Sequence, residues 1–109
     1  MSNLQAVLAI TTVSSGEDAE KLVRALLEQR VIACGSILPP MRSMYRWEGG
    51  IVDESEVLVL LKTGADRVAQ LKSALQELHP YKVPELLTFA ARDGLSEYLA
   101  WLAEEVRPL

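Results

Sequence analysis

Residues 44–63, MYRWEGGIVDESEVLVLLKT, decide the fold of this chain. Gly49-Gly50 lies between aromatic residues on one side and β-branched residues on the other, which is typical of a β-hairpin turn. The second arm is long, because residues 51–63 as one strand would span about 43 Å. A compact domain of this chain length has a radius of gyration of only about 13 Å. We therefore predict a hairpin that extends beyond its own globule.

Periodic apolar segments flank this hairpin on both sides. Residues 5–13 and 31–37 are apolar and predict strands. Ser15, followed by Asp18 three residues later, resembles a helix capping box. Pro80 ends a second helix, because the residue before a proline is steered away from helical geometry. Apolar residues at helical spacing mark three helices: Ala19, Leu22, Val23, Leu26 and Leu27; Val68, Leu71, Leu75 and Leu78; and Leu95, Tyr98, Leu99, Leu102 and Val106.

The predicted order of elements is β-α-β-β-α-β followed by a C-terminal helix, with residues 84–91 as the last strand. This order predicts an α+β fold of the ferredoxin-like split βαβ type, in which helices cover one face of an antiparallel sheet. Residues 1–109 form one domain. The other sheet face and the hairpin edges stay bare, and exposed edges invite pairing with another chain. We expect identical copies to cover them.

Composition and charge limit the classes of partner. The formal net charge of -4 argues against nucleic-acid binding, which requires a basic face. The apolar run at residues 6–10 is too short for a signal-peptide core or a membrane span. Cys34 is the one cysteine and cannot form a disulfide within the chain. We expect a cytoplasmic protein without membrane insertion.

The loop His79-Pro80-Tyr81-Lys82-Val83-Pro84-Glu85 concentrates varied chemistry between the second helix and the last strand. Its two prolines restrict their own backbone and that of the preceding residues, so the loop is stiff. A stiff loop keeps its side chains in place. This loop is therefore predicted to be a ligand site or a contact between subunits.

Several short motifs occur together in this order and spacing: Ala33-Cys34, Tyr45-Arg46-Trp47-Glu48-Gly49, Ser55-Glu56-Val57-Leu58, Lys62-Thr63, His79-Pro80-Tyr81, Val83-Pro84-Glu85, and Leu95, Glu97-Tyr98-Leu99 and Trp101. In these motifs the chain resembles the CutA family of divalent-cation tolerance proteins. The resemblance implies a homotrimer, similar to that of the PII signalling proteins, and a role in tolerance to copper and other divalent metals. The bound ion would be Cu(II) or another divalent cation, and folding would require none. Gly35, Ser36 and Lys82 depart from the family pattern, which usually has Val, Asn and an acidic residue at these positions.

His79 and Cys34 are the candidate transition-metal ligands, apart from three methionines. A structural zinc site needs about four protein ligands, and this chain has neither a Cys-x-x-Cys motif nor paired histidines. A trimer could instead combine His79 with Glu85 or Glu48 of a neighbouring copy. The competing interpretations are that His79 closes the helix end, which we favour, and that Cys34 packs as a small hydrophobic residue.

Two other patterns are weak metal signals. Met41 and Met44 imitate a copper-binding pair, but residues three apart on a strand face opposite sides of the sheet. The run Asp53-Glu54-Ser55-Glu56 is interpreted as a solvated hairpin surface that hard cations visit weakly.

Tyr45, Trp47 and Tyr81 are candidates for the lining of a ligand cleft, although aromatic residues are equally typical of subunit interfaces. Lys62, at the end of a hydrophobic strand, completes the candidate cleft. Two interpretations of Lys62 remain open: it pairs with a carboxylate such as Glu85, or it faces an anion between subunits.

The leading hypothesis is a trimeric, non-catalytic protein that binds divalent ions. The alternative is a PII-like sensor or scaffold that holds a small organic anion between subunits. Catalysis is disfavoured, because the first strand–helix turn, residues 11–16, lacks the arginine of a phosphate-cradling loop. No pattern places Cys34 beside His79 as a nucleophilic pair.

Overall fold

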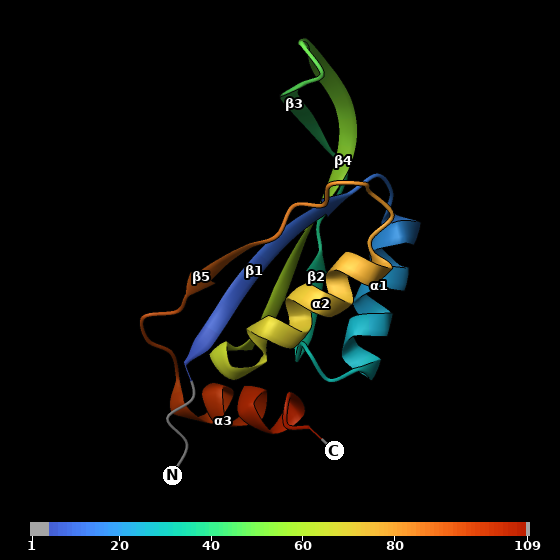
Figure 1. Cartoon of the computed structure of the whole chain (residues 1–109). Helices are drawn as coiled ribbons and strands as arrows, with labels where there is room; N and C mark the ends of the chain where they lie inside the picture. The colour runs from blue at the N-terminus through green and yellow to red at the C-terminus, as the bar shows by residue number, and fades with distance from the viewer. Residues whose placement is uncertain (1–4, 109) are drawn as a thin grey trace.

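The computed structural model describes residues 5–108 and contains five strands, three α-helices and one short 3₁₀ helix (Figure 1). In chain order they are β1 (Ala6–Val13), α1 (Gly16–Glu28), β2 (Cys34–Ile37), β3 (Met41–Trp47), β4 (Gly50–Gly64), the 3₁₀ helix (Ala65–Arg67), α2 (Val68–Leu78), β5 (Leu87–Ala90) and α3 (Ser96–Glu105). The strand predicted to precede the hairpin is split into β2 and β3 around Pro39-Pro40, and both parts pair with β4. Among residues 5–108, no helix is long and apolar enough to cross a membrane.

All strands of the sheet are antiparallel, in the order β2-β4-β1-β5, and β3 continues along the far half of β4. Helix α1 links β1 to β2 across the inserted β4, which is the split βαβ arrangement. Helices α1 and α2 lie on one side of the sheet, and α3 lies across its lower end (Figure 1). The structure confirms the predicted fold class.

The main core lies between the sheet and the α1–α2 pair. Leu26 of α1, Leu61 of β4 and Leu71 of α2 are fully enclosed there. The predicted cap of α1 is confirmed, since Ser15 Oγ accepts a hydrogen bond from the Asp18 N–H at 3.1 Å. A second, smaller cluster lies under α3 and comprises Ala33, Leu102 and Val106 with Ala6 at its edge.

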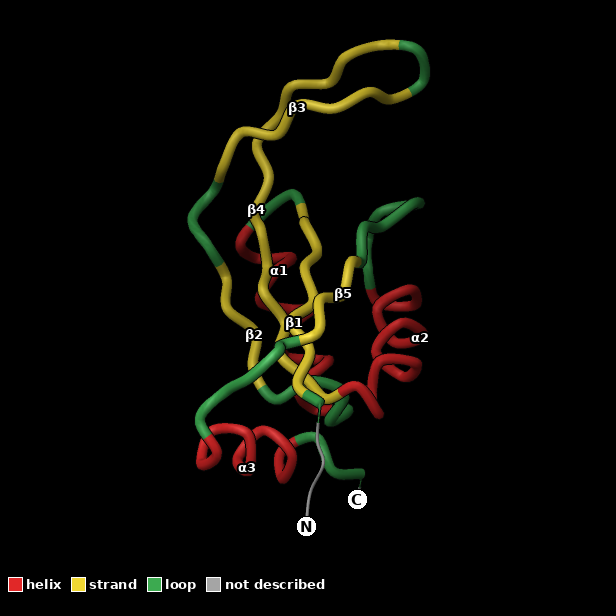
Figure 2. Tube along the Cα trace, turned by 90° about the vertical axis from the view of Figure 1, so that its left-hand side faces the viewer, coloured by secondary structure: helices red, strands yellow, loops and turns green. Residues whose placement is uncertain are grey.

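The β3–β4 hairpin extends far beyond the globule, as predicted (Figures 1 and 2). The molecule measures 50 × 26 × 23 Å, and its long dimension includes this hairpin. Met44, Trp47 and Ile51 are large apolar residues on the hairpin that remain 46–70 % exposed. Among residues 5–108, nothing covers the greater part of the hairpin surface.

The last strand is shorter than predicted. Residues 84–91 were expected to pair, but β5 spans only Leu87–Ala90, opposite Val7–Ile10 of β1. Pro84 has no N–H to donate to a neighbouring strand. The preceding loop is also held against the hairpin by Tyr81, so the chain meets β1 only from Leu87 onward.

Candidate functional site

His79 anchors the proline-rich loop to the sheet. Its ring nitrogen Nε2 lies 2.8 Å from the Thr12 carbonyl oxygen, and Nδ1 lies 3.1 Å from the Tyr81 backbone nitrogen. The Tyr81 N–H must donate, so Nδ1 accepts and Nε2–H donates to Thr12. One neutral tautomer satisfies both bonds. The imidazole is 6 % exposed and packs against the Tyr81 ring with 4.8 Å between centroids.

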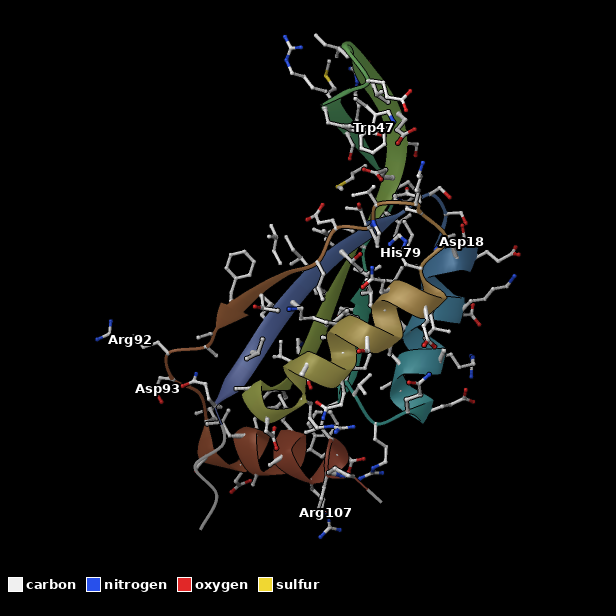
Figure 3. The ribbon with its side chains drawn as sticks, viewed as in Figure 1. Asp18, Trp47, His79, Arg92, Asp93 and Arg107 are labelled. Atoms are coloured by element: carbon white, nitrogen blue, oxygen red, sulfur yellow. The ribbon has the colours of Figure 1, made fainter. Side chains whose placement is uncertain are left out.

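The hairpin presents one aromatic and acidic face. In an antiparallel ladder, alternate residues of each strand and their cross-strand partners share a face. Tyr45 pairs with Val52 and Trp47 with Gly50, so Tyr45 and Trp47 share a face with Glu54 and Glu56. Figure 3 places Trp47 on the hairpin, above His79 at the hairpin's base. The anchored loop and this face therefore lie opposite one another.

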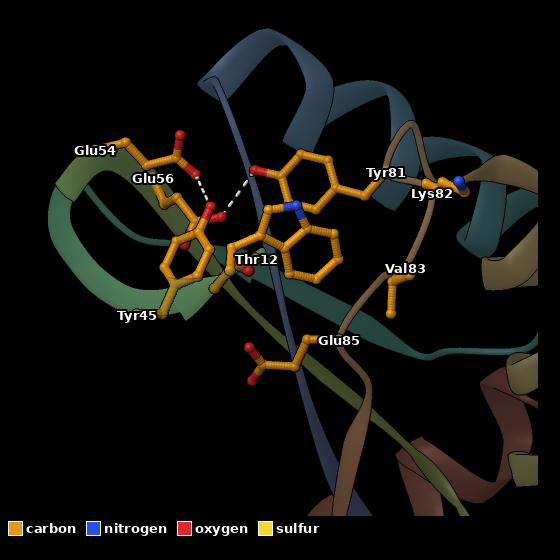
Figure 4. A pocket seen from close by; sticks show the side chains of 9 residues that line it. Thr12, Tyr45, Glu54, Glu56, Tyr81, Lys82, Val83 and Glu85 are labelled. Carbon is orange, nitrogen blue, oxygen red and sulfur yellow. Dashed lines mark hydrogen bonds between the residues drawn. The ribbon is translucent and has the colours of Figure 1, made fainter. Parts of the chain in front are cut away.

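Between the loop and the hairpin lies a cavity of about 430 Å³ (Figure 4). Its size is within the range of small-ligand pockets. It is lined by Thr12 from β1, by Tyr45, Trp47, Glu54 and Glu56 from the hairpin, and by Tyr81, Lys82, Val83 and Glu85 from the loop.

Two phenol–carboxylate hydrogen bonds define the acidic side of this cleft. Tyr45 Oη donates to Glu54, and Tyr81 Oη donates to Glu56 Oε2 at 2.8 Å. The bond to Glu54 raises the pKa of Tyr45 to about 12. Burial, followed by the bond to Glu56, raises the pKa of Tyr81 well above its ordinary value. Both phenols therefore remain protonated donors at neutral pH.

Glu56 corrects the interpretation of residues 53–56 as a solvated surface. Its side chain is 6 % exposed, because the His79–Glu85 loop folds over it. Asp53 lies on the opposite hairpin face and pairs with Arg42, whose Nε and Nη2 lie 2.9 and 2.6 Å from its two oxygens. This hydrogen bond holds the pKa of the Asp53 carboxyl below its usual range.

The structure brings together four of the eight candidate site residues: Tyr45, Trp47, Tyr81 and Glu85 all line the cleft. His79 lies behind it and positions Tyr81. The remaining three lie elsewhere, with Lys62 and Cys34 facing each other as cross-strand partners and Glu48 at the exposed hairpin turn.

Lys62 pairs with neither Glu85 nor any other carboxylate within 4 Å among residues 5–108. Cys34 is half-buried, and its Sγ lies 3.9 Å from Ser36 Oγ. Met41 and Met44 face opposite sides of β3, as expected, because their partners Glu56 and Asp53 are three register positions apart in the ladder.

The donors present do not form a metal centre within one chain. In the described range 5–108, no group of three or more His, Cys, Asp or Glu residues is arranged to bind one ion. Both ring nitrogens of His79 are already engaged in hydrogen bonds. A metal ligand at His79 would have to displace Thr12 or Tyr81.

Thr12, Glu54, Glu56, Lys82 and Val83 also line the cleft but were not named as individual site residues, although Lys82 and Val83 belong to the loop predicted to be a site or a subunit contact. The strand alternation contains a signal for two of them, since Glu54 and Glu56 share the hairpin face of Tyr45 and Trp47. Thr12 carries no comparable sequence signal, because the loop reaches it through the tertiary fold.

The family model for the CutA1 divalent ion tolerance proteins matches residues 7–105. The chain belongs to the CutA family. It is 41 % identical over 97 residues to the divalent-cation tolerance protein CutA of Thermus thermophilus, covering 89 % of this chain and 94 % of that protein. The corresponding Pyrococcus horikoshii protein is 42 % identical over 101 residues, with 93 % and 98 % covered.

Solved CutA structures share the fold. The crystal structure of the divalent ion tolerance protein CutA1 from Ehrlichia chaffeensis superimposes with a TM-score of 0.92 at 30 % identity, covering 97 % of this chain and 99 % of that one. The Thermus thermophilus structure gives 0.88 at 40 % identity, with 92 % and 97 % covered. The sequence resemblance to CutA is thereby confirmed.

Proposed function

We propose that this CutA family member acts in divalent-cation tolerance by binding the cations directly, as a non-catalytic cytoplasmic homotrimer. Cu(II) or a similar ion is the proposed cargo. The observation that carries the proposal is the acidic lining of the cleft, in which Glu54, Glu56 and Glu85 face a shared cavity. Carboxylates attract cations and repel anions.

The donors for such an ion are proposed to come from more than one copy. One chain has no complete donor set among its described residues. Glu48 is exposed at the end of the overhanging hairpin, where it is free to reach a neighbour. Glu48 of one copy and Glu85 in the cleft of another are the proposed contributors, because neither has an ion-pair partner within residues 5–108.

Assembly is supported by the apolar surface that one chain leaves uncovered. Leu87, Phe89, Leu95, Tyr98 and Trp101 from β5 and the α3 region are between 43 and 82 % exposed. Together with the exposed apolar residues of the hairpin, they form a surface of the kind that marks contacts between proteins. Identical copies are the proposed cover.

A small organic anion suits this cleft poorly. Lys82 is the one basic residue in the lining, and Figure 4 shows its side chain pointing away from the aromatic rings. Three carboxylates would repel the ligand. The PII-like alternative is therefore set aside.

Calorimetric titration of the metal-free protein with Cu(II) tests the proposal. We expect saturable, stoichiometric uptake of Cu(II). The affinity should fall at least about tenfold in Glu85→Gln or Glu48→Gln, because each substitution removes one ligating carboxylate. Glu28→Gln, an exposed carboxylate at the end of α1, is the matched control and should bind as the parent does. Absence of saturable heat in the parent protein would contradict direct binding.

A further inference from the structure

The carboxylate of Glu56 is buried without a compensating cation. The side chain is 6 % exposed, and the phenol of Tyr81 is the one hydrogen-bond donor that it has among residues 5–108. No lysine, arginine or histidine nitrogen within that range lies within 4 Å of it. A carboxylate has two acceptor oxygens, so one hydrogen bond leaves Glu56 able to accept from a positively charged donor. Glu56 also lines the cavity, so that donor can arrive from the cleft.

Aromatic rings form the apolar part of the same cavity. Trp47, Tyr45 and Tyr81 all line it, and the indole is 46 % exposed. Aromatic faces attract cations, and tryptophan does so most strongly. In Figure 4 the Glu85 carboxylate lies apart from Glu54 and Glu56, with the cavity between them. The site therefore combines an aromatic wall with carboxylates on two sides.

This arrangement fits a cation larger than a bare metal ion. The carboxylates do not converge into one coordination sphere, as shown by the absence of a metal-binding group among the described residues. They surround about 430 Å³ instead. A metal ion needs ligands at about 2–2.5 Å, whereas an organic cation bridges such separations with its own N–H groups and apolar body.

We propose that the cleft binds a small organic cation with N–H donors, of the ammonium, amidinium or guanidinium class. The charged group donates to Glu56 Oε1, which has no hydrogen-bond partner among residues 5–108, and the apolar body lies against Trp47 and Tyr81. Glu54 and Glu85 add to the negative potential. This binding requires no metal ion, although Glu85 also belongs to the metal site proposed above.

Benzamidine and benzamide are matched probes for this site. They have nearly the same shape, but only benzamidine is positively charged at neutral pH. The chain has two tryptophans, and Trp47 lies in the cleft, so the fluorescence of the parent protein reports on this site. In the presence of a metal chelator, we expect benzamidine to quench this fluorescence saturably and to bind at least about tenfold more tightly than benzamide.

Glu56→Gln removes the charge but retains an oxygen that accepts from Tyr81. It should weaken benzamidine binding about tenfold or more and leave benzamide binding unchanged. Glu54→Gln provides a second test at an exposed position, in a variant that keeps the buried Glu56. It should weaken benzamidine binding by a smaller factor. Glu28→Gln removes one exposed negative charge that is not part of the cleft lining and should bind like the parent protein.

Equal affinity for the two probes, or benzamidine affinity unchanged in both cleft variants, would overturn the proposal. So would a cleft that takes up neither probe because a basic side chain of a neighbouring copy fills it. Because the chelator removes metal ions, the benzamidine results are independent of the Cu(II) calorimetry. Metal uptake without benzamidine binding overturns only this inference, and the reverse result overturns only direct metal binding.

Discussion

The two ends of strand β4 contrast sharply. Near the globule, Val57, Val59 and Leu61 are at most 2 % exposed, between α1, α2 and the neighbouring strands. Toward the hairpin turn, Ile51 is 70 % exposed, and within residues 5–108 this half of β4 pairs with β3 alone. The buried half stabilises the single chain. The exposed half carries apolar side chains of the kind found in subunit interfaces.

The largest expected effect distinguishes these two halves directly. Leu61→Ala should lower the free energy of unfolding by about 2–5 kcal/mol, because it opens a cavity in an enclosed core. Ile51→Ala on the same strand should change it by less than about 0.5 kcal/mol in a monomeric state. Urea denaturation at several protein concentrations measures both. Equal losses at all concentrations would contradict the contrast.

Gly35 allows α1 to approach the sheet closely. A Cβ there would lie 2.6 Å from Val23 Cγ1 and 2.8 Å from Cγ2. Gly35→Ala should therefore destabilise the protein by about 1–3 kcal/mol in thermal or urea unfolding. Val23→Ala in the same chain should recover part of that loss. Gly16→Ala is the control, since its Cβ would meet nothing within 4 Å, and comparable losses at both glycines would disprove close packing as the cause.

Removing the Tyr81 hydroxyl leaves the buried Glu56 carboxylate without its hydrogen-bond donor. Tyr81→Phe should lower stability by about 1–3 kcal/mol. Tyr98→Phe is the matched control, because Tyr98 is 43 % exposed and its hydroxyl has no hydrogen bond among residues 5–108. Chemical denaturation measures both variants. Identical stabilities would show that the cleft side of the hairpin is not held by this contact.

Alkaline pH provides a smaller test of the hairpin face. The folded-state pKa of Tyr45 is raised to about 12, while an unfolded tyrosine titrates near about 10. Its contribution to stability is therefore complete below about pH 10 and is lost as the pH rises toward about 12. Ultraviolet titration of tyrosinate should show a late transition in the parent protein that Tyr45→Phe removes. A titration curve in which Tyr45→Phe removes no late transition would contradict this expectation.

The smallest effect is expected on the opposite hairpin face. Arg42 and Asp53 form an exposed ion pair, with side-chain exposures of 74 and 40 %. Exposed pairs contribute little, so Arg42→Ala should lower the free energy of unfolding least of these variants, and less still in high salt. Denaturation at two salt concentrations measures this. A larger, salt-independent loss would show that this face is also covered.

The sequence pattern predicted the globule better than the cleft. Helical spacing and the Ser15 cap are local signals, and the corresponding elements form as predicted. The hairpin also forms, but its turn is Glu48-Gly49 rather than Gly49-Gly50, because Gly50 already pairs with Trp47 as the first residue of β4. Three aromatic residues of the cleft were also identifiable, because aromatic residues at a hairpin and a proline-rich loop are conspicuous. The burial of Glu56 was not, since it depends on Tyr81, which is 25 residues distant in sequence.

The role of His79 shows the same limit. Its place at the helix end follows from Pro80, but its bond to the Thr12 carbonyl joins residues 67 apart in the sequence. Lys62 was grouped with the cleft because it ends a hydrophobic strand. Strand register instead places it opposite Cys34 and Leu8, away from the cavity. Local patterns predict elements, whereas contacts between distant segments determine which polar groups share a site.

Sedimentation equilibrium in dilute solution tests the central claim most directly, namely that other copies cover the overhanging hairpin. We predict a particle of three times the 12.0 kDa chain mass, which dissociates or unfolds more readily when Ile51 and Trp47 are replaced by Ser. A stable, fully folded particle of 12.0 kDa at micromolar concentration would contradict the claim.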